Sequence, residues 1–399
     1  MEAYLDNAAT TRVSEKAAEI AEKVMKEDYG NPSSKHIKGF DAEQYIKNSA
    51  KIIADTLKVQ PKEIIFTSGG TESNNMALSG AAFSKIRSGK KIISTSFEHA
   101  SVYSPLLALK DFEFDIEFAP VDALGHVKID ELLNMIDDNT TLVSVMYVNN
   151  EVGAVQDIAA ISKAVKEKKP DIIFHVDAIQ AYGKYRINPK KEGIDLLSVS
   201  GHKIHAPKGS GFLYADEKVK LRPLIFGGGQ QKNRRSGTEN VPAIAGLGEA
   251  VREAYEDFEQ KTEHIYGLKE HFLESITEVP GTHVNAVPSL KTVNEDNDNK
   301  VFDVRQTAPH IVSISFDKIK AEVLLHALEE RGVYVSSGSA CSSNHPGLSS
   351  TLQAIGVRKD LLDSTLRFSF SRYTTMEEID YCIDVVKELV PIYSRFTRK

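Results

Sequence analysis

Lys203 stands where a predicted strand gives way to a small polar turn, a position at which a lysine can do covalent chemistry. The apolar run Ile194–Leu197 predicts the strand, and the turn that follows contains Ser200-Gly201-His202-Lys203. Burying an amine costs desolvation free energy unless the amine is paired, neutralised or used. A desolvated amine near other cations loses its proton and can attack a carbonyl to form an imine. From Lys203 alone, pairing and covalent attachment of a carbonyl compound both remain open.

A glycine-rich turn, Ser68–Asn74, lies between a predicted strand over 62–67 and a predicted helix over 71–83. Its glycines let the backbone approach a ligand closely, and Thr71 is placed to cap the helix while free N–H groups face an anion. A tight turn with a good N-cap explains the sequence equally well, because the spacing of a G-x-x-x-x-G-K-[ST] loop is absent. Gly70 and Thr71 are therefore candidate anion ligands.

Two polar side chains follow the apolar strand predicted over 172–176. Asp177 stands at the strand exit, where a carboxylate can hold a proton on a heteroaromatic ring nitrogen and keep the ring an electron sink. Gln180, one turn further on, is placed to donate to a ring oxygen. A helix cap is the alternative role for Asp177.

One histidine is a candidate for acid–base chemistry, and two others raise the question of a metal site. His99 follows Glu98 at a predicted helix start, where an imidazole can stack on a flat cofactor and move protons near neutral pH. A plain surface position is the alternative. His202 and His205 share a loop, but no paired ligands occur at a convincing spacing, so we predict no metal site.

The two cysteines differ in their surroundings. Cys341 lies within Ser336–Gly347, a stretch too small and polar for a core, where an unpaired thiol is a candidate nucleophile. Cys382 lies among apolar residues of a predicted terminal helix over 376–392, which favours packing. Their contexts do not indicate a disulfide framework.

Two basic segments could bind anions. Arg367, in a predicted strand over 366–369, can hold a substrate carboxylate through two parallel hydrogen bonds, or form a surface ion pair. The loop Arg234–Asn240 combines arginines with hydroxyls, which suits a phosphate but also solvent.

These residues fall at the ends of alternating strands and helices. β-branched strands separated by helices predict an α/β fold with a mainly parallel sheet covered on both faces, whose ligands gather at the carboxyl ends of the strands. The strands are predicted over 62–67, 91–94, 114–118, 141–147, 172–176, 196–198 and 211–214 (the last at an edge), and the helices over 71–83, 99–109 and 158–167.

A smaller α+β domain is predicted after a long helical pattern over 242–276. The polar segment Pro288–Gln306, rich in Asn and Asp, is predicted to be a mobile loop. The predicted boundaries are 14–258 for the large domain and 1–13 with 259–399 for the small one. Further strands are predicted over 310–316 and 366–369, and helices over 321–331 and 376–392.

Composition excludes several classes of protein. A formal net charge of −7 disfavours general nucleic-acid binding. No apolar segment is long enough to span a bilayer, and the start of the chain lacks the pattern of a secretory signal. We therefore expect a cytoplasmic protein without direct contact to nucleic acid or membrane.

Taken together, the motifs resemble those of the cysteine desulfurases of the NifS and IscS type, in the class V aminotransferase-like branch of pyridoxal-phosphate enzymes. The ordered match spans nearly the whole chain, and it implies the pyridoxal-phosphate fold type I. The matching segments are Tyr4–Thr11, Gly70–Asn75, Glu98–His99, Asn149–Gly153, Val176–Gln180, Ser200–Lys203, Arg234–Thr238, Ser336–Cys341 and Arg367–Phe368.

The resemblance implies pyridoxal 5'-phosphate as cofactor, held covalently by Lys203. Asp177 would face its pyridine nitrogen, Gln180 its phenolic oxygen, and His99 would stack on its ring. The implied phosphate ligands are Gly70, Thr71, Ser200 and His202, joined by Thr238 of the neighbouring subunit because the family is homodimeric.

The resemblance also implies the reaction. Asn150 and Arg367 would hold the carboxylate of an L-cysteine substrate, and Cys341 would attack its sulfur. Alanine would leave, and a persulfide on Cys341 would pass to an acceptor, either an iron–sulfur scaffold or a tRNA-thiolation enzyme.

Other functions remain open on the residues alone. A selenocysteine lyase or a small-amino-acid aminotransferase of the same fold would use the same cofactor. A non-catalytic sulfur-relay or assembly partner would keep the fold without the chemistry.

Overall fold

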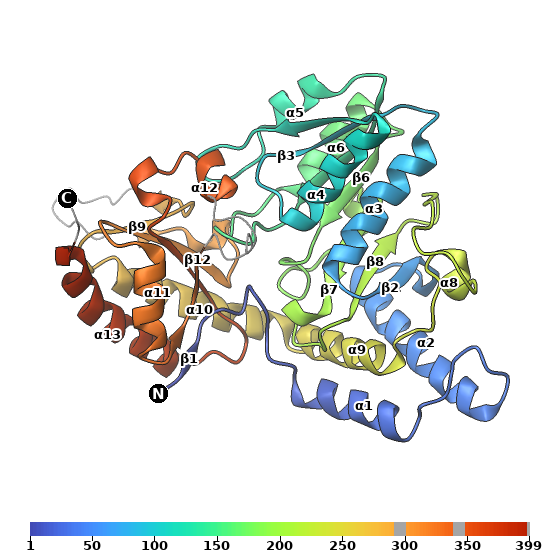
Figure 1. The fold of residues 1–399 in the computed structure, drawn as a ribbon, viewed down its shortest axis with the longest axis horizontal. Helices are drawn as coiled ribbons and strands as arrows, with labels where there is room; N and C mark the ends of the chain where they lie inside the picture. Colours follow the sequence, from blue (N-terminus) through green and yellow to red (C-terminus); the bar gives the residue numbers. More distant parts are fainter. Residues whose placement is uncertain (291–300, 338–347, 397–399) are drawn as a thin grey trace.

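Alternating strands and helices build the larger of two lobes in this computed structural model, which describes residues 1–290, 301–337 and 348–396 (Figure 1). The seven strands of its sheet are, in spatial order, β2 (Ile64–Thr67), β8 (Gly211–Ala215), β7 (Leu196–Ser200), β6 (Ile173–Asp177), β5 (Thr140–Met146), β3 (Lys91–Thr95) and β4 (Asp115–Ala119). Only β8 runs antiparallel to its neighbours. The prediction of a mainly parallel sheet is confirmed.

Both faces of this sheet are covered. Ile92 and Ile93 lie in two different hydrophobic clusters, as do Leu196 and Leu197, because successive side chains of a strand point to opposite faces. Helices α3 and α4 pack on one face, and α2, α6 and α9 on the other. The helices of this lobe are α1 (Glu15–Lys26), α2 (Ile37–Leu57), α3 (Gly70–Lys85), α4 (Ala100–Leu109), α5 (Ile129–Met135), α6 (Ile158–Lys168), α7 (Pro189–Glu192), α8 (Gln230–Asn233) and α9 (Val241–Tyr255).

Strand β8 is not the edge strand that the sequence predicts. It lies between β2 and β7, and β2 occupies the edge. Phe212, Leu213 and Tyr214 are all fully buried. A strand with large apolar side chains on both faces is stable only where both faces of the sheet are packed against helices, and an interior position in the sheet meets this condition.

The helical pattern over 242–276 is two helices rather than one. Helix α9 ends at Tyr255, and α10 (Phe258–Ile276) begins after Asp257, whose φ of 47° is left-handed. The rings of Tyr255 and Phe258 stack across the break with centroids 5.3 Å apart. This aromatic contact favours the turn that takes the chain into the second lobe.

The second lobe is an antiparallel sheet with helices, joined by the N-terminus through parallel pairing of β1 with β13 (Figure 1). Leu352 and Ile355, which follow residues 338–347 in the sequence, instead join the core of the large lobe. The predicted domain boundaries remain a prediction. The elements are β1 (Ala3–Tyr4), α10, β9 (Thr282–Val284), β10 (Ser289–Leu290), β11 (Val301–Phe302), β12 (Ile311–Phe316), α11 (Ala321–Glu329), β13 (Val333–Tyr334), β14 (Ser336–Ser337), α12 (Ser350–Ala354), β15 (Thr365–Ser369) and α13 (Met376–Tyr393).

The segment predicted as a loop over 288–306 contains more regular structure than expected. Its described ends, β10 and β11, pair as antiparallel strands. Residues 291–300 lie outside the described part of the chain. Among the described residues, no helix is both long and apolar enough to cross a membrane.

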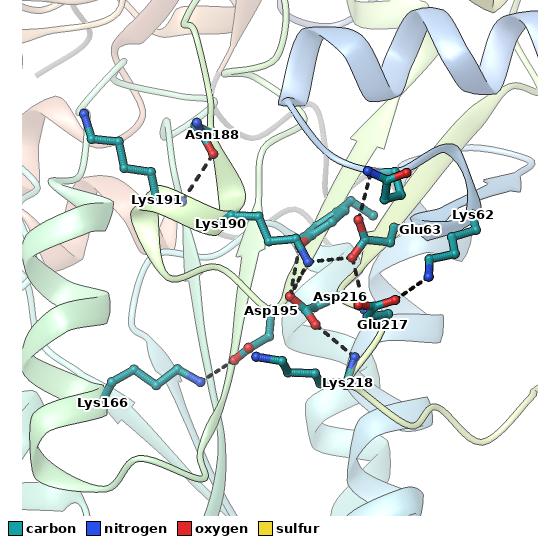
Figure 2. Close-up of polar contacts among 12 residues, drawn as sticks. Lys62, Glu63, Lys166, Asn188, Lys190, Lys191, Asp195, Asp216, Glu217 and Lys218 are labelled. Atoms are coloured by element: carbon teal, nitrogen blue, oxygen red, sulfur yellow. Dashed lines mark hydrogen bonds and ion pairs between the residues drawn. The ribbon is translucent and has the colours of Figure 1, made fainter.

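An ion-pair network lies at the edge of the sheet where β2 and β7 begin (Figure 2). The Lys190 ammonium donates to Glu63 at 2.6 Å and to Asp216 at 2.7 Å. The Glu63 side chain is only 1% exposed, so its carboxylate depends on Lys190 and on main-chain donors. Burial alone would raise the pKa of Asp216, but hydrogen bonding and the charge of Lys190 hold it below its usual range.

Lys190→Met is expected to lower the free energy of unfolding by roughly 1–3 kcal/mol, because it leaves the buried Glu63 carboxylate without a cation. Lys191→Met, at an exposed neighbour, should change it by less than about 0.5 kcal/mol. The pKa of Asp216 is lower in the folded protein than in the unfolded chain, where it is about 4. The ionised Asp216 therefore stabilises the fold at pH values above about 4, and this contribution is lost as the pH falls through the pKa of the folded state. Urea unfolding should therefore show the Lys190→Met deficit shrinking below about pH 4, whereas a pH-independent deficit would contradict the assignment.

Candidate active site

A cavity of about 260 Å³ lies at the carboxyl ends of β5, β6 and β7, where sheets of this kind bind ligands. Met146, Asp177 and Ser200, the last residues of these strands, all line it. The start of α3, the N-terminal segment and β15 of the small lobe complete the wall. The predicted site residues in the wall are Gly70, Thr71, His99, Asn150, Asp177, Gln180, Ser200, His202, Lys203 and Arg367.

Lys203 reaches this cavity from a short 3-10 helix, Gly201–Lys203, that follows β7 directly. Its Nζ donates to the main-chain oxygens of Ala8 and Ala9, each at 2.6 Å. Main-chain carbonyls compensate part of the desolvation of this half-buried amine. The amine is thus brought into the cavity, as the sequence predicts.

Asp177 is a buried carboxylate held by neutral donors. Asn74 Nδ2 donates to Oδ2 at 2.8 Å, and the main-chain N–H of Ile179 donates to Oδ1 at 2.9 Å. Burial raises the pKa of Asp177, and these hydrogen bonds oppose the rise. A cation entering the cavity would favour the ionised carboxylate, which suits the predicted pairing with a protonated ring nitrogen.

His99 is the N-cap of α4, so its ring has a fixed proton position. Nδ1 accepts from the main-chain N–H of Ser101 at 3.1 Å and lies 2.9 Å from the Ser101 hydroxyl. Burial lowers the pKa of His99. The ring is therefore neutral with its proton on Nε2, and it is not the surface residue that was the alternative.

The turn before α3 approaches its neighbours very closely. Gly69, at φ +151°, occupies the N-cap position without a side-chain cap, so the prediction that Thr71 caps this helix is wrong. A Cβ on Gly70 would lie 2.2 Å from Ile179 Cδ1, which only glycine avoids. Thr71 is instead free of a capping role and lines the cavity.

A hydroxyl and an imidazole lie at this end of the cavity, the ring contacting the Thr10 hydroxyl through Nδ1 at 3.2 Å. Ser200 Oγ is buried and has no hydrogen-bond partner within the described ranges. Burial and the charge of Lys203 lower the pKa of His202 to about 4, so its ring is neutral at pH 7. With the N-terminus of α3, these groups fit the phosphate of a cofactor.

Arg367 forms a buried ion pair rather than a surface one. Its Nη2 donates to Asp6 Oδ1 at 2.9 Å, and Nη1 donates to the main-chain oxygen of Asn150 at 2.9 Å. The Arg367 side chain is 5% exposed, and its buried Nε has no partner among the described residues. Asn150 thus contacts Arg367 through its backbone.

One predicted site residue among the described residues is not part of the cavity wall. Thr238 is exposed and lies outside it. Cys341 falls in 338–347, outside the described residues. Cys382 is fully buried, as predicted for a packing residue, and burial raises the pKa of its thiol.

Four functional contacts escape sequence reasoning. Asp6 pairs with Arg367, Asn74 with Asp177, and His310 with Gln180 at 3.1 Å. Lys184 Nζ donates to the main-chain oxygen of Lys203 at 2.7 Å. The Asp6, Asn74 and His310 contacts join residues more than 100 positions apart, so no local spacing could reveal them. Asp6 and Asn74 stand in segments that the motifs had singled out, Tyr4–Thr11 and Gly70–Asn75, whereas Lys184 and His310 do not.

Comparison with known proteins identifies the family. A sequence model described as aminotransferase class-V matches residues 3–382. The chain belongs to the class-V aminotransferase family. This family member is 40% identical over 387 residues to a protein named cysteine desulfurase IscS from Methanosarcina thermophila, with 97% of this chain and 91% of that protein covered.

Solved structures agree with this class-V aminotransferase assignment. A NifS-like protein matches with a TM-score of 0.89 and 34% identity, covering 98% of this chain and 100% of that one. A structure described as SspA in complex with cysteine matches with a TM-score of 0.79 and 32% identity, covering 94% and 100%. The resemblance inferred from the motifs is confirmed, and the class-V aminotransferase family depends on pyridoxal phosphate.

Glu98 is a second buried acid beside the cavity residues. The Thr95 hydroxyl and the Met146 main-chain N–H both donate to its Oε1, at 2.6 and 2.9 Å. Its Oε2 is buried with no partner within the described ranges. Burial, together with the charge of nearby Asp177, raises the pKa of Glu98 to about 8, so Glu98 is protonated at pH 7.

Glu98→Gln is expected to become more stable relative to the wild type as pH rises from 6 to 8. In that range the folded wild type holds a proton that the unfolded chain has released, so its unfolding free energy falls with pH. Glutamine lacks this dependence, and the relative gain should be roughly 1 kcal/mol per pH unit. Urea unfolding at pH 6, 7 and 8 measures it, with exposed Glu274→Gln as the control. Parallel profiles for wild type and Glu98→Gln would contradict a protonated Glu98.

Proposed function

We propose that this protein is a pyridoxal-phosphate-dependent cysteine desulfurase, which converts L-cysteine to L-alanine and holds the sulfur as a persulfide on Cys341. One cavity supports the cofactor part of this proposal: it is lined by a lysine amine, a buried carboxylate and a buried arginine, namely Lys203, Asp177 and Arg367. The observation that carries the desulfurase reaction is the desulfurase names of relatives at about 40% identity over nearly the full chain. They do not favour a selenocysteine lyase, an aminotransferase or a non-catalytic partner.

Lys203 would hold the cofactor through its amine, and Asp177 would hold a proton on the pyridine nitrogen. Pyridoxal phosphate, when bound, supplies an electron sink for charge that develops at the substrate Cα. His99 would stack on the ring and Gln180 would donate to its phenolic oxygen. The unpartnered Ser200 hydroxyl and the neutral His202 would donate to the phosphate, with Thr71 and the backbone at Gly70.

The substrate carboxylate would bind Arg367 in place of, or beside, Asp6, with Asn150 next to it. A guanidinium offers several parallel donors, so one carboxylate can join another there. The Lys203 amine would move the proton at Cα. Each of these roles uses a side chain that already faces the cavity.

The sulfur step would belong to Cys341. Its thiolate attacks the substrate sulfur, so that a sulfur–sulfur bond forms and the carbon–sulfur bond breaks. The electron pair of the broken bond stays with the carbon fragment, which takes up a proton and leaves as alanine. Ser336 pairs with Arg367 in the small sheet, and five residues of chain span at most about 18 Å. Connectivity therefore keeps Cys341 within reach of a substrate held by Arg367.

Cys341→Ser is expected to abolish sulfide and alanine formation from L-cysteine while the cofactor absorbance persists, because only the sulfur acceptor is lost. Lys203→Ala should lose both the activity and the cofactor absorbance, since it removes the residue to which the cofactor would be attached. Cys382→Ala, a substitution in the core of the small lobe, is the matched control and should keep activity. Alanine, sulfide and protein persulfide are measured together. Undiminished sulfide release by Cys341→Ser would refute the proposed nucleophile.

We also propose a homodimer in which Thr238 reaches the phosphate of the neighbouring subunit. Thr238 is exposed and outside its own cavity, while nearby Phe226 is 74% exposed. An exposed aromatic side chain of this kind is typical of a surface that packs against a partner. The acceptor of the persulfide, an iron–sulfur scaffold or a tRNA-thiolation enzyme, and a cytoplasmic location stay predictions.

Sedimentation of the purified protein at micromolar concentration is expected to give twice the 44.0 kDa chain mass. Phe226→Glu should shift the protein toward the monomer and weaken cofactor retention, because the neighbouring Thr238 is withdrawn. Exposed Val323→Glu, on α11 of the small lobe, is the control and should leave both unchanged. A wild type that sediments as a monomer and retains the cofactor would rule out a contribution from a second subunit.

A further inference from the structure

Gln180 and His310 form a buried contact that links the two lobes. Gln180 follows β6 of the large lobe, and His310 immediately precedes β12 of the small one. The Gln180 and His310 side chains belong to residues only 5% and 1% exposed, and His310 Nε2 lies 3.1 Å from Gln180 Oε1. On its other side, Gln180 Nε2 donates to the main-chain oxygen of Ala8 at 3.0 Å.

These partners fix which way the Gln180 amide faces. Turning the amide over would place Oε1 against the Ala8 carbonyl, so two acceptors would meet. With Oε1 facing His310, the imidazole must donate from Nε2, and its proton position follows from the hydrogen bonds. The same Ala8 oxygen accepts from Lys203 Nζ at 2.6 Å, so the Gln180 amino group lies on the side of the reactive lysine.

The surroundings of His310 favour this single neutral form. Its Nδ1 is buried without a hydrogen-bond partner among the described residues, so a proton there would have no acceptor. Burial lowers the pKa of His310 well below its usual value, and positive charges lower it further. The charged groups that act on it are Lys184, Lys269, Arg367 and Lys203.

We propose that His310 is a positioning residue: it holds the Gln180 amide so that the amino group, not the oxygen, faces the cofactor oxygen in the cavity. This rests on the proposed function, in which Gln180 donates to that oxygen. Without His310, the amide keeps only its contact with the Ala8 oxygen, and Oε1 loses the donor that holds it away from the cavity. A residue of the small lobe thus sets the hydrogen-bonding character of a large-lobe ligand.

The first test concerns the protein alone and needs no activity. Long-range ¹H–¹⁵N spectra of histidine-labelled protein, prepared without cofactor, should show His310 as the neutral Nε2–H form, and His310→Gln identifies its signal by loss. An Nδ1–H form, or a doubly protonated ring at pH 7, would overturn the proposal.

The second test follows the visible absorbance of the bound cofactor against pH. His310→Phe keeps a ring but removes the donor, and it should raise the absorbance midpoint by about one pH unit, since a hydrogen bond to a charged oxygen is lost. His310→Gln restores an N–H donor and should return the midpoint toward the wild type. His283→Phe, a histidine on β9 outside the cavity, is the control and should not move it.

The outcomes separate the two proposals. If borohydride reduction of the wild type gives no cofactor adduct on Lys203, the proposed function fails. If the adduct forms and His310→Phe leaves the midpoint unchanged, the positioning role fails and the function stands. If His310→Phe does not fold, the ¹H–¹⁵N spectra of the wild type still test the proposal, because they show whether the His310 proton is on Nε2.

Discussion

The site depends on how the molecule holds the half-buried amine of Lys203. This amine donates to the main-chain oxygens of Ala8 and Ala9, which come from the N-terminal segment rather than from the sheet. That segment begins in the small lobe, where Ala3 pairs with Val333, and Asp6 then binds Arg367. One extended stretch therefore fixes the lysine and the arginine relative to each other, although they belong to different lobes.

Neutral histidines and hydrogen-bonded carboxylates define the electrostatics around this amine. Burial keeps His99, His202 and His310 neutral, so each can donate without adding positive charge beside Lys203. The two buried acids, Asp177 and Glu98, differ in their hydrogen-bond partners. Asp177 has donors on both oxygens, which favour its charged form, whereas Glu98 leaves one oxygen unpartnered and is protonated. Burial raises the pKa of both acids, and the hydrogen bonds to Asp177 oppose that rise on both of its oxygens.

The sequence predicts the positions of those site residues that lie at the ends of strands. Asp177 and Ser200 end parallel strands, and Lys203 follows one closely, so a pattern of apolar runs places them at one edge of the sheet. Contacts between distant segments are beyond such reasoning, as the pairing of Asp6 with Arg367 illustrates. The predictions that are wrong also failed because of tertiary packing. Strand β8 is interior because both of its faces need cover, and the 242–276 pattern breaks at Asp257, where the chain changes lobes.

The cavity by itself does not distinguish a desulfurase from an aminotransferase. A lysine amine, a carboxylate for a ring nitrogen and an arginine for a carboxylate serve any reaction that draws electrons from Cα. What differs is the group that meets the substrate side chain. Strand β14 contains Ser336, which pairs with Arg367, and Cys341 follows Ser336 by five residues in the sequence. On the other side of residues 338–347, the Ser349 hydroxyl donates to Glu151 of the large lobe. Both described ends of the segment that contains Cys341 in sequence are therefore tied to residues near the cavity, Arg367 and Glu151. A cavity whose residues serve several reactions of one cofactor is consistent with a fold that supports more than one function.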